Sequence, residues 1–150
     1  MLSLEDAATG KRVAMRLGNL TPETRALWGR MSPHQMVCHL SDSFRFALEL
    51  KTASPASGPL QRTVMKWSAL YLPVRWPKGV PTRPEMEQGK GGTPPAEFTA
   101  DLKELAGLME TFARRTAFDV AHPIFGVMTT REWLRWGYLH ADHHLRQFGV

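Results

Sequence analysis

Apolar residues recur at steps of three and four along much of the chain, which is the spacing of one face of an α-helix. One such stretch follows Ser32, which together with Pro33 and Gln35 has the composition of a helix N-terminus. Its apolar positions are Met36, Leu40, Phe44, Ala47 and Leu48. The pattern predicts a helix that begins at residue 33, ends at about Leu50 and buries one face.

Two further stretches show the same period. The first covers residues 60–72 and ends before Pro73, and its buried side is expected to carry Val64, Trp67 and Leu70. The second is expected to begin near Pro95 and to end at about Phe118. Its apolar stripe consists of Phe98, Leu102, Leu105, Met109 and Phe112. Both stretches predict amphipathic helices.

A capping box made of Thr129 and Glu132 predicts the start of the last helix. Along this helix one stripe holds Trp133, Gly137, His140 and His144. Shorter helices are expected from Thr21 to Trp28 and within residues 4–17, where the N-terminal and amphipathic signals are briefer.

Between residues 74 and 95 the chain contains five prolines and four glycines, which disfavours a regular element. No sustained alternation of apolar and polar residues predicts a strand. The chain is therefore expected to be all-α, a four-helix bundle with short extra helices and a long Pro/Gly-rich loop across one end. Its length is that of one ordinary domain, so residues 1–150 are predicted to form a single domain.

The composition of the chain indicates the cellular environment of the protein. Cys38 is the only cysteine, which rules out a disulfide within the chain and favours a reducing, cytoplasmic location. No stretch approaches the roughly eighteen uninterrupted apolar residues of a membrane span, and residues 1–6 do not resemble a signal peptide. We therefore expect no membrane association.

The net charge of +5 raises the possibility of a nucleic-acid partner. The basic residues, however, are scattered among acidic ones, and no basic run is interleaved with aromatic residues. A mildly cationic, solvated surface explains the charge better, so nucleic-acid binding is the less favoured hypothesis.

The histidines carry the main chemical signal. His140 and His144 are offset on a helix by about 40° around the axis and about 6 Å along it, so both rings can reach one cation. His34 follows a helix cap and is expected to be exposed, whereas His122 precedes a proline in a turn. His39 lies in the middle of a helix and is expected to face the core. His39, His140 and His144 are therefore the candidate metal ligands.

Alternatives remain at each position. His143 could replace His144, because three-residue spacing also fits one helix face. His143 or Asp142 could instead orient the ligands. His39 alone could be an ordinary buried histidine with a hydrogen-bond partner, and Cys38, which projects about 100° away from it, is more simply a buried apolar residue than a ligand.

Three protein ligands leave positions open for water or substrate, which is typical of catalytic sites. No catalytic residue is assigned.

Several motifs together carry a family resemblance: Ser32-Pro33, His39-Leu40, Phe125-Gly126, Thr129, Trp133, His140, His143-His144 and Gln147. In this order they resemble the DinB/YfiT-like superfamily of metal-binding four-helix bundles, from about Thr21 onward. The turn at residues 122–126 and the ending at residues 143–148 resemble an uncharacterised branch of it.

The resemblance implies that the metal histidines are His39, His140 and His144 and that the divalent ion is zinc or nickel. Characterised relatives include bacillithiol S-transferases, mycothiol-dependent isomerases and hydrolase-like proteins, and many are homodimers. The resemblance thus implies a metal-dependent transferase or hydrolase that activates a low-molecular-weight thiol or water towards a small electrophilic substrate. The alternative is a helical bundle that binds a metal or ligand without catalysis.

Overall fold

The computed structural model describes residues 1–150 and contains helices and loops but no β-strand. The α-helices are α1 (Ala7–Leu17), α2 (Pro33–Ala47), α3 (Lys66–Tyr71), α4 (Phe98–Ala113) and α5 (Thr130–Gln147). A π-helical turn, η1 (Gln61–Met65), leads directly into α3, and a 3₁₀ turn, η2 (Pro84–Met86), lies within the long loop. The structure confirms the predicted all-α class.

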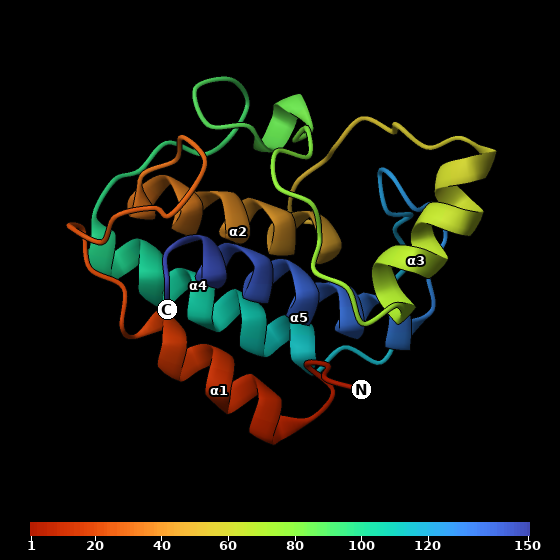
Figure 1. The fold of residues 1–150 in the computed structure, drawn as a ribbon, viewed down its shortest axis with the longest axis horizontal. Coiled ribbons are helices and arrows are strands. Elements are labelled where there is room, and N and C mark those ends of the chain that lie inside the picture. Colours follow the sequence, from red (N-terminus) through yellow and green to blue (C-terminus); the bar gives the residue numbers. More distant parts are fainter.

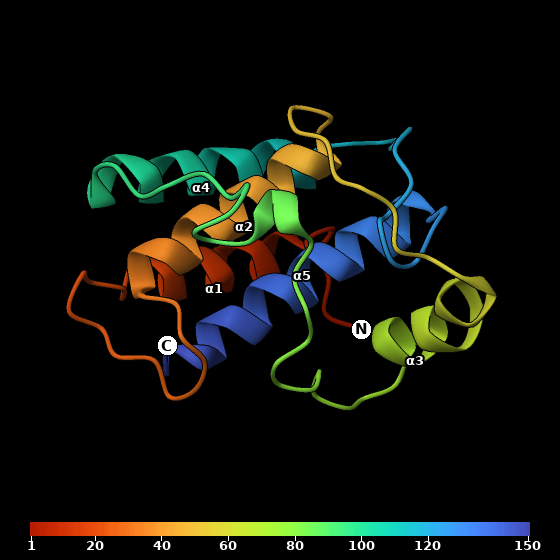
Figure 2. The same ribbon diagram turned by 90° about the horizontal axis from the view of Figure 1, so that it is seen from above.

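Helices α1, α2, α4 and α5 lie against one another, while α3 lies at one end of this assembly (Figure 1). Helix α2 packs on α4, and α5 contacts α1, α2 and α3. The view from above shows the long loop from α3 passing across α5 towards α2 (Figure 2). The assembly therefore places α2 and α5, the two helices that carry the candidate ligands, in direct contact. None of the helices combines the length and the apolar composition that a membrane crossing requires.

Capping boxes fix where these two helices begin. The Ser32 hydroxyl accepts a hydrogen bond from the Gln35 backbone N–H, and the Gln35 side chain accepts one from the Ser32 N–H. Thr129 and Glu132 make the same reciprocal pair at the start of α5. Both predicted helix starts are confirmed, and each is a capping box. Each satisfies backbone donors that a helix N-terminus leaves free, so the register of each helix is fixed from its first turn.

The core is aromatic on the side where α4 and α5 meet α2. Phe44, Phe112 and Trp133 are fully buried, and the rings of Phe44 and Phe112 lie 5.0 Å apart in an edge-to-face arrangement. The predicted stripe of α4 faces this core, with Leu105 buried as well. Complete burial of each such side chain stabilises the fold by about 1.5–3 kcal/mol.

The helix predicted from Thr21 to Trp28 was wrong. Hydrogen bonds between the backbone and side chains of Thr21 and Thr24 close a single turn there. Beyond it, the Leu27 N–H donates to the carbonyl oxygen of Gln147 at 2.7 Å, which ties the segment to the end of α5. A tertiary hydrogen bond thus replaces the intrahelical one that the local sequence favoured.

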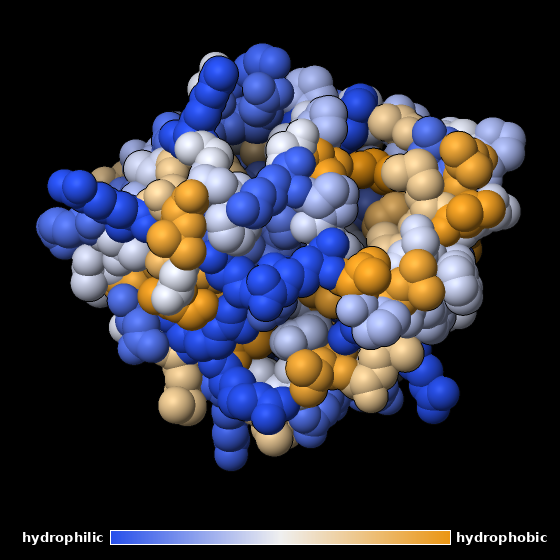
Figure 3. All heavy atoms as spheres, viewed as in Figure 1, coloured by the Kyte–Doolittle hydropathy of each residue, from blue (hydrophilic) through white to orange (hydrophobic).

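The predicted buried face of residues 60–72 was wrong in part. Leu70 is buried, but Val64 is 60% exposed and Trp67 is 56% exposed. Helix α3 packs against the end of α5, so only part of its apolar surface is covered. Figure 3 shows apolar side chains gathered on the side of the molecule where α3 lies.

Two helices also end earlier than predicted. Helix α2 stops at Ala47 because Glu49 adopts a left-handed backbone conformation with a φ of 65°. Helix α4 spans Phe98–Ala113 and therefore ends before Phe118. The overestimate arises because apolar residues continue the helical period beyond the point where the backbone turns away.

Candidate metal centre

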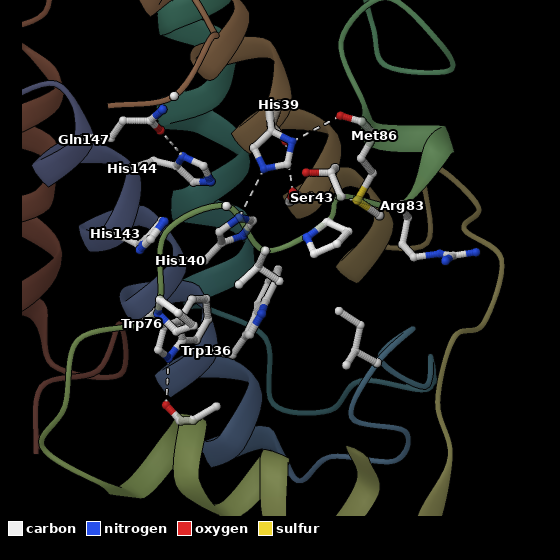
Figure 4. A pocket seen from close by; sticks show the side chains of 18 of the residues that line it. His39, Ser43, Trp76, Arg83, Met86, Trp136, His140, His143, His144 and Gln147 are labelled. Atoms are coloured by element: carbon white, nitrogen blue, oxygen red, sulfur yellow. Dashed lines mark hydrogen bonds between the residues drawn. The ribbon is translucent and has the colours of Figure 1, made fainter. Parts of the chain in front are cut away.

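Three histidine rings from two helices converge on one point (Figure 4). His39 comes from α2, and His140 and His144 come from α5; each offers a ring nitrogen within 4.8 Å of the other two. The ring centroids are 4.8 Å apart for His39 and His144, 5.0 Å for His140 and His144, and 5.2 Å for His39 and His140. The structure thus brings together the three residues that the sequence singled out, and their arrangement could hold a metal ion.

Hydrogen bonds fix the orientation of two of these rings. His39 Nδ1 lies 3.1 Å from the carbonyl oxygen of Met86, and His144 Nδ1 lies 2.8 Å from Gln147 Oε1. Both partners are acceptors, so each Nδ1 carries the hydrogen and each Nε2 presents a lone pair. Gln147 Nε2 donates to the Trp28 carbonyl at 2.9 Å, which fixes the amide in this orientation. Such outer contacts are typical of histidines that bind metals.

The third ring is held differently. His140 Nε2 lies 3.2 Å from His39 Nε2, whereas His140 Nδ1 is buried and has no hydrogen-bond partner. Because His39 Nε2 is the acceptor, His140 Nε2 donates this hydrogen bond, and His140 presents a lone pair to an ion only when its hydrogen moves to Nδ1 and the bond between the two rings is given up. With that change all three Nε2 atoms would present lone pairs towards the common point.

Burial keeps the cluster uncharged. His39 is 4% exposed and His144 is 8% exposed. Burial is the main cause that lowers the pKa of all three histidines, and for His140 and His144 neighbouring imidazoles lower the pKa further. The rings are consequently neutral at physiological pH, and neutral imidazole is the form that coordinates metals.

The long loop supplies the contacts that sequence reasoning missed. It carries Met86, whose carbonyl oxygen accepts from His39, and Trp76, whose ring lies 6.2 Å from that of His140. The Trp76 indole N–H donates to the Ala69 carbonyl at 2.8 Å and so anchors the loop to α3. Prolines and glycines indicated an irregular segment, but nothing in their spacing could indicate which backbone carbonyl would reach a histidine.

A cavity of about 480 Å³ opens above the cluster. Aromatic rings form much of its wall, including those of Trp28, Trp76 and Trp136, and the ring of Trp136 lies 5.0 Å from that of His140. This volume lies in the range of small-molecule binding sites. The histidines therefore lie on the wall of a space that could contain a small molecule.

His143 lines the cavity but does not belong to the converging set. Its ring lies 6.0 Å from Trp28 and 6.2 Å from Trp76. Asp142 does not orient the ligands, because its two carboxylate oxygens accept from Arg16 at 2.7 Å and from Arg146 at 2.8 Å. The partners that orient the rings are instead the Met86 carbonyl and Gln147.

His122 has a structural part in the turn before α5. Its Nδ1 accepts hydrogen bonds from the backbone N–H groups of Ile124 at 3.2 Å and Phe125 at 3.1 Å, and its ring lines the cavity. Burial lowers the pKa of His122 from its ordinary value of 6.5 to about 3. The residue is thus a neutral histidine that holds the turn together.

A second group of possible ligands contains His34, Cys38 and Asp101. The prediction that His34 is exposed was wrong, since its Nε2 donates to Asp101 Oδ2 at 2.6 Å and 20% of its side chain is exposed. The same oxygen accepts from the Ala96 N–H at 3.0 Å and, more weakly, from the Cys38 thiol at 3.7 Å. Burial and the Asp101 carboxylate raise the pKa of the Cys38 thiol to about 12. The thiol therefore stays protonated, and the group is a hydrogen-bond network that joins α2 to α4.

Five α-helices and a buried three-histidine cluster define an all-α protein with a candidate metal site. The chain belongs to the family described as "Protein of unknown function (DUF1569)", whose profile matches residues 3–149. No curated protein and no solved structure shows significant similarity to the chain. Its function therefore has to be inferred from the site itself.

Proposed function

We propose that this protein binds one divalent metal ion through His39, His140 and His144 and uses it as a transferase or hydrolase of the DinB/YfiT-like superfamily. The observation that carries the proposal is the pair of fixed tautomers. His39 and His144 each donate from Nδ1 and aim the Nε2 lone pair at a common point. The packing of α1, α2, α4 and α5 supports a four-helix bundle of that type.

The donor set indicates which metals fit. Three neutral imidazoles suit zinc, nickel, copper or iron, whereas magnesium and calcium prefer oxygen ligands. Zinc or nickel agrees with the family resemblance. When bound, such an ion supplies a positive charge that lowers the pKa of an adjacent water or thiol.

The residues of the chain prepare the site in three ways. Met86 and Gln147 hold the Nδ1 hydrogens of two ligands in place. Trp76 and Trp136 lie beside His140 and exclude water from that side of the cluster. The cavity provides room for a thiol and a small electrophile. Both substrates stay predictions, and so do the homodimer and the cytoplasmic location.

Metal content tests the proposal directly. We expect about one equivalent of zinc or nickel in protein purified without added metal, and loss of the ion in His140→Ala, because two imidazoles alone are weak ligands. His34→Ala is the matched control, since it removes a half-buried histidine outside the cluster. Only traces of metal in the wild type, unchanged by His140→Ala, would overturn the proposal.

The alternative of a non-catalytic metal protein is tested after metal binding is established. The metal-loaded chain is assayed with thiol cosubstrates and electrophiles, and with ester and amide substrates for hydrolysis. Turnover that disappears in His140→Ala supports an enzyme. Metal binding without turnover in any of these assays supports a module that the ion only stabilises.

A further inference from the structure

The cavity above the histidines is lined by basic residues and by no acidic residue. Arg30, Arg75 and Arg83 contribute to its wall, whereas none of the 14 Asp and Glu residues of the chain does. None of the three arginines forms an ion pair within the chain. Because the histidines are neutral, the only charged residues in the wall of the cavity are cationic.

The arginines come from two separate segments. Arg30 lies in the connection before α2, and Arg75 and Arg83 lie in the long loop. Arg83 is held in place, since its Nε donates to the Ser54 carbonyl at 3.0 Å and its Nη2 to the Ser54 hydroxyl at 2.6 Å. Figure 4 shows Arg83 on the opposite side of the pocket from His143 and His144.

The charges of Arg30 and Arg75 have no carboxylate partner within the chain. Hydrogen bonds with Ser54 and, less strongly, the charge of Arg83 lower the pKa of Glu85, so the charge of Arg83 is partly compensated, although Glu85 does not line the cavity. Lys78 adds a further cation, with its Nζ 4.4 Å from the centre of the Trp28 ring. Arg30 and Arg75 are exposed at the rim of the cavity. Their guanidinium groups could therefore donate hydrogen bonds to a bound anion in place of water.

The rest of the wall is apolar. Trp28, Trp76, Trp136, Phe46 and Phe125 line the cavity, and the exposed side chains of Val74 and Val80 continue this surface to its rim. Flat aromatic walls bind an aromatic or aliphatic body, and a few placed polar groups then fix its orientation.

We propose that the cavity binds a small aromatic carboxylate. Its carboxylate lies at the arginines of the rim and its body lies between the tryptophan rings. The inference deepens the proposed function by naming the substrate class of the same site. The arginines, however, require no metal, so the two proposals can fail separately.

The test compares three probes of one shape. Naphthylacetate, the neutral naphthylacetamide and the cationic naphthylethylamine are titrated into the full chain by calorimetry, with the protein first treated with chelator and then loaded with zinc. We expect naphthylacetate to bind at least about tenfold more tightly than the amide in both forms, and the amine not to bind.

Variants identify the arginines as the cause. Arg30→Gln combined with Arg75→Gln is expected to reduce the preference for the carboxylate severalfold, and addition of Arg83→Gln to abolish it. Arg30 and Arg75 are exposed and unpaired, so the double variant keeps the fold. Arg131→Gln, an exposed arginine of α5 outside the cavity, should leave the preference unchanged.

Three outcomes would overturn the inference. Equal affinities of naphthylacetate and naphthylacetamide would remove the charge preference, and no binding of either probe at millimolar concentration would remove the site. A preference confined to zinc-loaded protein would assign the carboxylate to the metal instead of the arginines. That last result would leave the proposed metal site standing, whereas absence of metal in the wild type would not affect the arginine test.

Discussion

Gln147 connects the histidine cluster to the chain segment before α2 through one amide group. Its Oε1 accepts from His144 Nδ1, its Nε2 donates to the Trp28 carbonyl, and the side chain is buried. Replacement of either atom leaves a buried polar partner unsatisfied, which costs about 1–3 kcal/mol of stability. Gln147 thus contributes both to the orientation of the His144 ligand and to the stability of the fold.

We expect Gln147→Leu to weaken zinc binding by about 10–100-fold, because His144 loses the acceptor that fixes its tautomer. Competition with a chromophoric chelator measures the affinity. Gln88→Leu removes a glutamine of the long loop, which bonds to the Thr93 carbonyl away from the cluster, and should leave it unchanged. Equal zinc affinities of wild type and Gln147→Leu would refute the orienting role.

His122 makes the stability of the fold depend on pH. In the folded chain its pKa is lowered to about 3, whereas the unfolded chain has the ordinary value near 6.5, so the unfolded state binds more protons between these values. Stability contributed by this residue is therefore constant above pH 6.5 and falls by up to about 1.4 kcal/mol per pH unit below it.

The variant His122→Asn isolates this effect. Its side-chain oxygen can accept the same backbone N–H groups, but it does not titrate. Urea denaturation from pH 4 to pH 7 should show a shallower loss of stability for the variant than for the wild type. Parallel curves for the two proteins would mean that His122 is not the group responsible.

At the scale of elements, Gly137 allows α5 to pack closely against Phe112 of α4. A Cβ atom there would lie 2.5 Å from Phe112 Cε1 and 3.2 Å from Leu4 Cδ1, and both neighbours are buried. Glycine in a helix interior lowers helix propensity by about 1 kcal/mol. The contact between α4 and α5 therefore outweighs the preference of the helix itself.

Gly137→Ala is expected to destabilise the protein by about 1–2 kcal/mol, because overpacking of the core exceeds the gain in helix propensity. Gly107→Ala in α4, where a Cβ atom would meet no neighbour within 4 Å, should instead stabilise it by up to about 1 kcal/mol. Chemical denaturation measures both. Stabilisation by both variants would show that Phe112 yields to the added methyl group.

Helices could be predicted from the sequence where apolar residues recurred at helical spacing and a capping motif marked the start of the same stretch. The boxes at Ser32 and Thr129 placed the starts of α2 and α5, and this register aimed His39, His140 and His144 inward. An apolar stripe, by contrast, indicates which face of a helix is hydrophobic but not whether another element covers it. Val64 and Trp67 were therefore predicted to be buried and are exposed.

The other contacts of the site come from loop segments in which apolar residues do not recur at helical spacing. The Met86 carbonyl reaches His39 through a loop whose path is set by tertiary contacts such as that between Trp76 and Ala69. A backbone oxygen has no sequence signature, and an arginine in a loop has no predictable direction. The ligands could thus be identified from the sequence, but neither their orienting contacts nor the basic rim could be.

At the scale of the whole molecule, the proposed ion would join α2 to α5 at the point where residues 39 and 140 meet. An ion that binds only the folded chain stabilises it, by about 2.7 kcal/mol when its free concentration is one hundred times Kd. Chelator treatment should therefore lower the melting temperature of the wild type. His140→Ala should show no response to chelator, and an equal shift in both proteins would contradict a cluster-bound ion.

The long loop serves both the ligands and the cavity, because it holds the Met86 carbonyl against His39 and also carries Trp76, Arg75 and Arg83. A displacement of this loop would move the Met86 carbonyl that anchors His39 together with the residues that line the cavity. A cation at the cluster and an organic anion above it would consequently favour the same position of the loop, so that each raises the affinity for the other. By thermodynamic linkage, the factor by which the cation raises the affinity for the anion equals the factor by which the anion raises the affinity for the cation.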